Sequence, residues 1–383
     1  MRFLVVGNPE NRRLTAFAAA VHAAGHEADL LSWSDLLRGR ADLKERAEGA
    51  VVKLDSPGED FEVERRLIAL GAEVEDREHP DAEFVSAGHA LDLPPDRGRI
   101  RYARQWYRGF QQLLRTCARD FVAAPPQLLF NRPATIALQF DKPRCHERVR
   151  EAGVEVAPAL TRVDSYEALR DELRTAGWSR VFVKLSWGSS ASGVLALQVR
   201  PGRVQAETSV ELTREGGEVR LYNSLRVRRY TEEAEVALIV DTLAREGLHV
   251  ERWLPKASLE GRVFDLRVLV IGGRARQAVV RSSRSPLTNL HLDNERGDLS
   301  AVQARLGRAG WEAVEELAVR ACAPLPGLYA GVDVLIRSTW KGAAVVEVNA
   351  FGDLLPRLRH EGETCYEAEI NEVLRRVATR RPQ

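Results

Sequence analysis

Two short stretches near the end of the chain, YAGVDVLI (residues 329–336) and AAVVEVN (residues 343–349), carry the pattern that best indicates the fold. Both are rich in β-branched residues and are separated by a polar turn, which predicts two neighbouring strands. Residues two apart on a strand face the same side, so Glu347 and Asn349 project together while the flanking valines face the core. An antiparallel partner strand would place Asp333 beside them. Three oxygen ligands at one point suit Mg²⁺; a solvated, acidic sheet face is the alternative.

A second stretch, VFVKLSWGSSASGV (residues 181–194), joins a β-branched strand to a loop of glycine and serine. Backbone N–H groups of such a loop can cradle phosphate oxygens, with Lys184 supplying positive charge. The stretch is not a Walker A motif because its lysine precedes the loop. An ordinary hairpin turn is the alternative interpretation.

Lysine is rare in this chain. Of 56 basic residues only six are lysines, namely Lys44, Lys53, Lys142, Lys184, Lys256 and Lys341. Lysine offers phosphate oxygens a compact point charge, whereas the guanidinium group is wider and planar. The few lysines are therefore candidates for phosphate contacts.

A third polar pattern lies on the strand predicted over residues 263–271. Asp265 and Arg267 share one face of it. With a strict two-residue turn at Gly272-Gly273, Arg281 on the next strand lies opposite Phe264, on the other face. Arg281 can join Asp265 and Arg267 only if a bulge or the end of the strand redirects it.

Composition limits the class of protein. The 383 residues are 44% hydrophobic and 29% charged, values of a globular chain long enough for two or three domains. The 56 basic and 55 acidic residues nearly cancel, so the net charge does not favour nucleic acid or an anionic membrane as partner. No apolar run approaches the roughly 20 residues of a membrane-spanning helix. The four cysteines include no C-x-x-C pair, which argues against a zinc site or a disulfide framework. The first residues do not resemble a secretory signal, so we expect a cytoplasmic protein.

The first 125 residues alternate between strands and helices, which predicts a small parallel, Rossmann-like sheet. Strands are expected over 3–6, 28–33 and 50–54, and a helix over 62–70. Residues 97–122 predict a long basic amphipathic helix. Its apolar face carries Trp106, Phe110, Leu113, Leu114 and Cys117, and its arginines are Arg101, Arg104, Arg108 and Arg115. We favour a packed helix with a charged outer face over a nucleic-acid surface. A third interpretation, in which the arginines bind an acidic substrate, stays open.

After Pro125-Pro126 the pattern mixes helices with antiparallel strands, so the predicted fold class is α/β plus α+β. The expected helices are 166–176, 232–245 and 309–323; the expected strands are 180–185, 194–199, 203–212, 218–230, 248–254, 263–271, 275–281, 331–336 and 343–348. Residues 282–300 predict a long polar loop, which in a compact domain usually has a function.

Nine short strings follow one another along residues 126–350. They are FNRPATIALQFDK, EAGVEVAP, VFVKLSWGSSASGV, VERWL, DLRVLVIGG, VVRSS, TNLHL, GVDVL and VEVNA. In this order they resemble the ATP-grasp superfamily, in particular carboxylate–amine ligases of the ribosomal-protein glutamate ligase and glutathione synthetase type. The resemblance implies an N-terminal Rossmann-like, pre-ATP-grasp domain (1–125) and two lobes (126–253 and 254–383) that bind ATP between them, the second ending in a C-terminal helix.

The resemblance also implies roles for individual residues. Lys142 and Lys184 would contact the ATP phosphates. The loop that contains Gly188, Ser189, Ser190 and Gly193 would close over the phosphates. The segment Glu251, Arg252, Trp253 and Leu254 would read the adenine through its backbone, and Asp265 would bind the ribose. Asp333, Glu347 and Asn349 would hold two Mg²⁺ ions, for which Mn²⁺ could substitute. Arg281 and Asn289 would face the transferred phosphoryl group, with Arg267 assisting.

The implied activity is ATP-dependent amide formation between a carboxylate and an amine, small molecules or peptides, through an acyl phosphate with release of ADP and phosphate. Three departures from the family pattern put these substrates in question: Ala350-Phe351-Gly352-Asp353 after Asn349, a loop without paired glycines after Asn289, and the bulky Trp187. A kinase-like phosphotransferase and a non-catalytic nucleotide-binding protein are the alternatives. No membrane or nucleic-acid partner is expected, and a homodimer is the default assembly.

Overall fold

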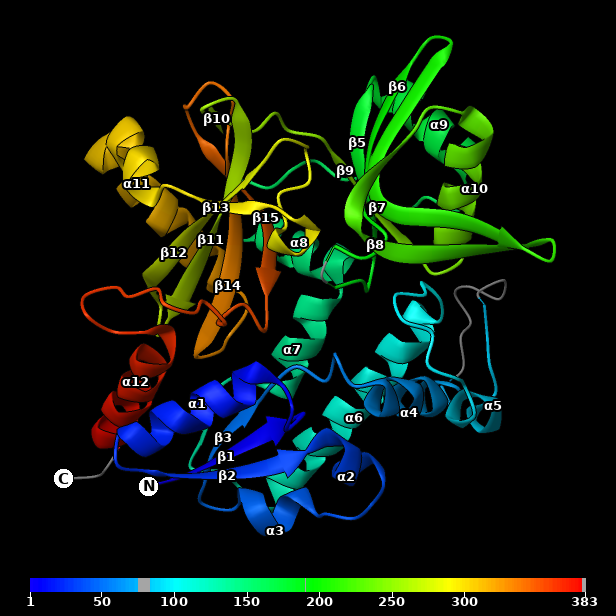
Figure 1. The fold of residues 1–383 in the computed structure, drawn as a ribbon. Coiled ribbons are helices and arrows are strands. Elements are labelled where there is room, and N and C mark those ends of the chain that lie inside the picture. The colour runs from blue at the N-terminus through cyan, green and yellow to red at the C-terminus, as the bar shows by residue number, and fades with distance from the viewer. Residues whose placement is uncertain (75–82, 190, 381–383) are drawn as a thin grey trace.

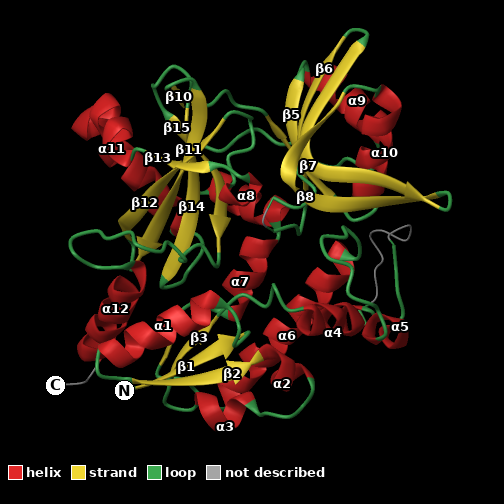
Figure 2. Cartoon of the chain, viewed as in Figure 1, coloured by secondary structure: helices red, strands yellow, loops and turns green. Residues whose placement is uncertain are grey.

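The computed structural model describes residues 1–74, 83–189 and 191–380, which form three sheets with their covering helices (Figures 1 and 2). Within these ranges no helix combines the length and the apolar character that crossing a bilayer requires.

The N-terminal sheet has four parallel strands in the order β2-β1-β3-β4. The strands are β1 (Arg2–Gly7), β2 (Glu27–Ser32), β3 (Val51–Leu54) and β4 (Leu128–Leu129), and the helices are α1 (Arg12–Ala23), α2 (Trp33–Leu37), α3 (Leu43–Ala47), α4 (Phe61–Gly71), α5 (Ala87–Leu91) and α6 (Ala103–Ala123). The predicted strand over 28–33 is one residue too long at its end. The Ser32 hydroxyl accepts hydrogen bonds from Ser34 N and Asp35 N, so Trp33 already begins α2.

Helix α6 begins six residues later than the prediction of 97–122. The chain before it pairs with the next sheet instead: Arg99 bridges to Tyr222, and Ile100 N donates to Leu221 O at 2.8 Å. Ile100 is buried in the core of that sheet. Packing between sheets therefore overrides the helical pattern of these residues.

The second sheet is antiparallel, in the order β8-β7-β6-β5-β9. Its strands are β5 (Arg180–Leu185), β6 (Leu195–Arg200), β7 (Arg203–Glu215), β8 (Glu218–Tyr230) and β9 (Leu248–Arg252), accompanied by α9 (Tyr166–Ala176) and α10 (Glu233–Ala244). The two helices lie on one face of the sheet (Figure 1). We call this unit the first lobe.

The third sheet has the order β13-β12-β11-β14-β15, with β10 paired to β11. Its strands are β10 (Ser258–Leu259), β11 (Arg262–Ile271), β12 (Arg274–Ser283), β13 (Glu295–Gly297), β14 (Tyr329–Ile336) and β15 (Ala343–Asn349); η1 (Leu290–Leu292) and α11 (Leu299–Cys322) accompany them. This unit is the second lobe. The predicted helix over 309–323 starts ten residues earlier because Asp298 caps α11, which is kinked at Gly307. The predicted loop 282–300 contains η1 and β13.

Three further helices join the units: α7 (Pro133–Phe140), α8 (Lys142–Glu151) and α12 (Cys365–Arg380). Cys145 and Val149 of α8 belong to the buried cluster of the third sheet. Helix α8 therefore packs on the second lobe, although its sequence precedes the first lobe. Helix α12 packs against α1, where the rings of Phe17 and Tyr366 meet edge to face at 5.5 Å.

Candidate active site

The two strands that carry the acidic residues lie side by side in the third sheet. Asp333 of β14 is directly opposite Glu347 of β15, and Asn349 is opposite Gly331. The Asn349 side chain donates to the Gly331 carbonyl oxygen at 3.2 Å. The structure thus brings the predicted metal ligands to neighbouring positions on two strands.

A β-bulge at Val346 modifies this pairing. Asp333 faces Glu347, whereas Val334 faces Val345, so Val346 is the extra residue. The expectation that both valines flanking Glu347 face the core is therefore wrong for Val346. It is half-buried and packs beside Leu254 on a separate small apolar cluster.

Two arginines converge on Asp333. Arg267 lies opposite Asp333 in the register of β11 and β14, and its Nε donates to Asp333 Oδ1. Arg281 Nη2 is 3.0 Å from Asp333 Oδ2. A β-bulge in β12, between the Val268 and Val270 pairings, shifts the register so that Arg281 faces Asp265 instead of Phe264. This is the redirection that Arg281 needs to join the site.

Asp265 is buried and its oxygens are already occupied. Arg281 Nε donates to Oδ1 at 2.7 Å, Lys256 Nζ is 3.0 Å from Oδ2, and the Thr288 hydroxyl also donates to Oδ2. Burial opposes ionisation, yet Arg281 and Lys256 hold the pKa of Asp265 well below its usual range. A ribose contact by Asp265 stays a prediction, and it requires that Arg281, Lys256 or Thr288 release its hydrogen bond to the carboxylate.

Thr288 is a functional candidate that the sequence interpretation missed, and no partner was predicted for Lys256. Lys256 also donates to Thr288 Oγ1 at 2.6 Å and to Pro286 O at 3.3 Å, so it ties the segment before η1 to Asp265. The rarity of lysine was the available signal for Lys256. Asn289, the predicted residue of this segment, uses its side chain to accept from His291 N at 2.9 Å, and none of its described hydrogen bonds reaches the arginines.

Two lysines and two glutamates line one pocket between the lobes. Lys142 at the start of α8 forms an ion pair with Glu347 at 2.9 Å and donates to the Gly188 carbonyl oxygen. Lys184 on β5 donates to Glu251 at 2.5 Å. Burial raises the pKa of Glu347, but Lys142 and Lys184 outweigh it and hold the pKa below its usual value. Burial lowers the pKa of Lys184, whereas Glu251 and Glu347 raise it, with a net increase. The attraction between opposite charges in this pocket therefore favours the ionised forms of Lys184, Glu251 and Glu347.

The glycine-serine loop follows Lys184 directly. Gly188 lies against Lys142, and Gly193 has a positive φ of 66° and would bring a Cβ within 2.8 Å of Leu185. The Ser189 carbonyl oxygen accepts a hydrogen bond from Ser192 N at 2.9 Å, which closes a turn within the loop. A phosphate contact by Ser189 stays a prediction. Ser190, also predicted to bind phosphate, lies outside the described residues.

Trp187, at the start of this loop, is held by α6 of the N-terminal unit. Its ring stacks on Tyr107 with centroids 5.4 Å apart, and the Arg104 guanidinium lies 5.3 Å from the Trp187 ring. Arg104 is only 3% exposed. The prediction of a charged outer face for the arginines of this helix is therefore wrong for Arg104, because Trp187 and the first lobe cover it.

The predicted adenine segment ends β9 and leads toward the second lobe. Arg252 N donates to Pro158 O at 2.7 Å and Trp253 N to Arg180 O at 3.1 Å. Leu254 is buried in the small apolar cluster that also contains Val346. The backbone role of this segment stays a prediction, since two of its N–H groups already have partners.

Comparison with solved structures gives the class of fold. The chain is similar to the ATP-grasp ligase PsnB in complex with a precursor peptide and AMPPNP (16% identity, TM-score 0.52, 97% of each chain). It is also similar to D-cycloserine synthetase DcsG (14% identity, TM-score 0.57, 98% of this chain and 100% of that chain). A third similar structure is macrocyclase MdnC bound with precursor peptide MdnA from Microcystis aeruginosa MRC (11% identity, TM-score 0.55, 98% of this chain and 100% of that chain).

No protein-family model matches the sequence, and no curated protein matches it. The chain has the ATP-grasp fold.

Proposed function

We propose that this chain is an ATP-dependent carboxylate–amine ligase that forms an amide bond through an acyl phosphate and releases ADP and phosphate. The observation that carries the proposal is the meeting of Lys142, Lys184 and Glu347 in one pocket, with Asp333 and its two arginines on the adjoining strands. The ATP-grasp fold supports it, and so do the names of the similar structures, which are an ATP-grasp ligase, a D-cycloserine synthetase and a macrocyclase. In this proposal the N-terminal parallel sheet is the Rossmann-like, pre-ATP-grasp domain.

The residues on β14 and β15 fit magnesium. Asp333 and Glu347 carry carboxylates at directly opposite positions, and Asn349 keeps its amide oxygen while its nitrogen donates to Gly331. Two arginines contact Asp333 and Lys142 contacts Glu347, so a bound ion would take the place of some of these contacts. Mg²⁺ prefers such hard oxygen ligands and completes its shell with water and phosphate oxygens. We propose that these three residues hold two Mg²⁺ ions, or Mn²⁺ in their place. The bound ions would neutralise charge on the β- and γ-phosphates.

The protein's own cations would stabilise the transferred group. A carboxylate oxygen attacks the γ-phosphorus of ATP, the bond to the β-phosphate oxygen breaks, and ADP leaves. The amine nitrogen then attacks the acyl carbon, the carbon–oxygen bond to phosphate breaks, and a proton from nitrogen passes to solvent. Lys142 and Lys184 would offset the negative triphosphate, and Arg281 with Arg267 would face the phosphoryl group as charge develops.

Lys142 also links the loop to this chemistry. It donates to the carbonyl oxygen of Gly188 in the glycine-serine loop and forms an ion pair with Glu347 on β15, one of the proposed Mg²⁺ ligands. A loop held in this way would exclude water from the acyl phosphate, which otherwise hydrolyses.

Small molecules and peptides are both proposed as substrates. PsnB and MdnC were solved with precursor peptides, whereas DcsG is a D-cycloserine synthetase. We therefore propose an assay panel of free amino acids and of peptides that contain aspartate and glutamate, as donors of the carboxylate.

The test uses hydroxylamine as the amine. Purified protein with Mg²⁺ and ATP should release ADP and form a hydroxamate with a substrate of the panel, because hydroxylamine traps an acyl phosphate. Asp333→Asn and Glu347→Gln should each lower this turnover by about 100-fold or more. Glu172→Gln, on the exposed face of α9, serves as the control and should behave like the wild type.

Each alternative has its own outcome. A phosphorylated product without hydroxamate would indicate the kinase-like phosphotransferase. Binding of AMPPNP with no ADP release across the panel would favour a non-catalytic nucleotide-binding protein. Full turnover by either acidic-site variant would contradict the proposed ligase.

A further inference from the structure

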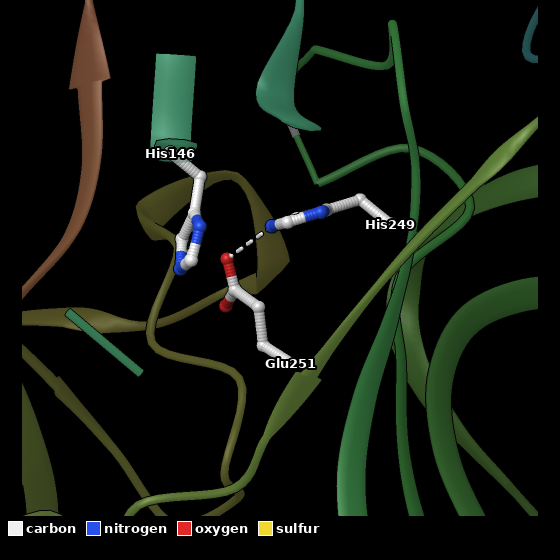
Figure 3. A group of neighbouring side chains, drawn as sticks. All are labelled: His146, His249 and Glu251. Carbon is white, nitrogen blue, oxygen red and sulfur yellow. Dashed lines mark hydrogen bonds and ion pairs between the residues drawn. The ribbon is translucent and has the colours of Figure 1, made fainter. Parts of the chain in front are cut away.

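Two histidines and a glutamate meet beside the proposed nucleotide pocket. His249 and Glu251 lie two residues apart on β9 and point the same way, and His146 approaches them from α8 (Figure 3). One ligand atom from each lies within 4.8 Å of the others. His249 Nε2 is 2.8 Å from Glu251 Oε1, and the two imidazole rings have centroids 5.1 Å apart.

We infer that His146, His249 and Glu251 form a binding site for one transition-metal ion of the Zn²⁺ class, distinct from the proposed Mg²⁺ site. Two imidazoles and one carboxylate are ligands that zinc accepts in a tetrahedral site with its fourth position open. Tetrahedral bonds of 2.0–2.1 Å place ligand atoms about 3.4 Å apart. Side-chain rotations that draw the farther ligand atoms together, and that part His249 and Glu251 slightly from their 2.8 Å contact, therefore complete the site.

The surroundings orient the ligands. His146 Nε2 lies 2.7 Å from the Ala157 carbonyl oxygen, an acceptor only, so this nitrogen carries a proton and the Nδ1 lone pair of the neutral ring is left for a metal. Bonding of the second ring nitrogen to a carbonyl is the usual arrangement around metal-bound histidine. The other carboxylate oxygen, Glu251 Oε2, accepts from Lys184 at 2.5 Å. No cysteine takes part, so the cysteine spacing could not reveal this site.

Lys184 decides which ions bind. Its ammonium group neutralises Glu251, so an entering cation must compete with it for the carboxylate. Mg²⁺, which prefers oxygen ligands, finds one contested carboxylate here and an oxygen-rich set on β14 and β15. Zn²⁺ and Co²⁺ gain two imidazole bonds that offset the competition. The ion also crosslinks α8, which packs on the second lobe, to β9 of the first lobe.

The test is a titration of the full-length, metal-free protein with Co²⁺ in excess Mg²⁺. We expect one equivalent of Co²⁺ per chain with the intense visible absorption of a tetrahedral nitrogen–oxygen site, and displacement by Zn²⁺. His249→Ala and His146→Gln should each weaken Co²⁺ binding by at least about tenfold. His89→Ala removes an exposed histidine of α5 and should leave binding unchanged. Lys184→Met should strengthen binding, because the competing ammonium is gone.

The wild-type titration alone can overturn the proposal. Absence of saturable tetrahedral Co²⁺ absorption would do so even if a histidine variant failed to fold. Unchanged affinity in a folded His146→Gln protein would do the same. In a second experiment, which rests on the proposed function, AMPPNP should lower Co²⁺ occupancy because Lys184 and Glu251 serve both ligands. If AMPPNP itself does not bind, the nucleotide proposal fails while the Co²⁺ titration still decides the metal site.

Discussion

Trp187 of the glycine-serine loop stacks on Tyr107 of α6, with ring centroids 5.4 Å apart and an interplanar angle of 13°. Tyr107 is itself held by a hydrogen bond from its hydroxyl to Ala137 O at 2.9 Å. A residue of the N-terminal unit thus supports the loop proposed to cover the phosphates of ATP. The unusual bulk of Trp187 has a structural reason, because a smaller side chain would lose the stack on Tyr107 and the contact with the Arg104 guanidinium.

Removal of this stack should weaken nucleotide binding. Loss of an aromatic pair costs about 0.5–1.5 kcal/mol beyond the area it buries, so Trp187→Ala should raise the Kd for AMPPNP by up to about tenfold. Trp187→Phe retains an aromatic ring and should stay within a few-fold of the wild type. Isothermal titration calorimetry measures both, and equal Kd values for Trp187→Ala and the wild type would show that the stack does not position the loop.

Arg281 should be required for stability as well as for activity. It is buried between Asp265 and Asp333, and its pKa lies above the ordinary value because these two carboxylates outweigh the effect of burial. Arg281→Met leaves both carboxylates short of a cation, which should lower the free energy of unfolding by about 3–5 kcal/mol. Denaturant unfolding followed by tryptophan fluorescence gives this value. Arg274→Met, at an exposed position of the same strand, is the control.

Glu246 should make stability depend on pH. Its carboxylate lies in the turn after α10 and accepts hydrogen bonds of 2.9 Å from Tyr102 N and Arg104 N, so it caps α6, which has no capping side chain of its own. Burial is the largest influence and raises the pKa of Glu246 from 4.5 to about 7; Glu83 adds to the increase, and the two backbone N–H groups oppose it.

The sign follows from linkage. Between pH 4.5 and about 7 the folded protein retains a proton on Glu246 that the unfolded chain has released, so this group's contribution to stability falls as pH rises. The shift corresponds to about 3 kcal/mol across the window. Glu246→Gln cannot titrate, so its free energy of unfolding should increase relative to the wild type between pH 5 and pH 8. The exposed Glu172→Gln protein should follow the wild type, and parallel curves for Glu246→Gln would contradict the expectation.

Lys53 should hold the N-terminal unit to the second lobe. Its ammonium is fully buried, 2.6 Å from Asp353 and 2.7 Å from Glu369, and lies over the Tyr329 ring at 4.0 Å. Asp353 stands four residues after Asn349, where the sequence departs from the family pattern, so this departure supplies the partner of Lys53.

Lys53→Met should lower the free energy of unfolding by about 3–5 kcal/mol, because buried Glu369 loses its ammonium partner and Asp353 is left with Arg13 at 2.6 Å. Lys44→Met, at an exposed lysine of α3, should change it by less than about 0.5 kcal/mol. Thermal unfolding monitored by circular dichroism compares the two. A Lys53→Met protein as stable as Lys44→Met would show that the buried ion pairs contribute nothing.

Local patterns sufficed for much of the fold. Helix α9 and strand β5 begin and end at the predicted residues, since Ser165 caps the helix and Gly177 ends it in a left-handed conformation. The pairing of Asp333 with Glu347 also followed from strand alternation and a short turn. In each case the residues that decide the structure are close together in the sequence.

The sequence by itself determined where most strands and helices lie, and which side chains share a face where a strand has no bulge, because these depend on nearest neighbours and on the period of each element. Only the tertiary structure decided that a bulge turns Arg281 toward Asp265, that Lys256 joins them, and that Tyr107 supports Trp187. Strand register and packing between units depend on contacts between segments far apart in the chain. Such contacts leave no periodic signal in either segment alone.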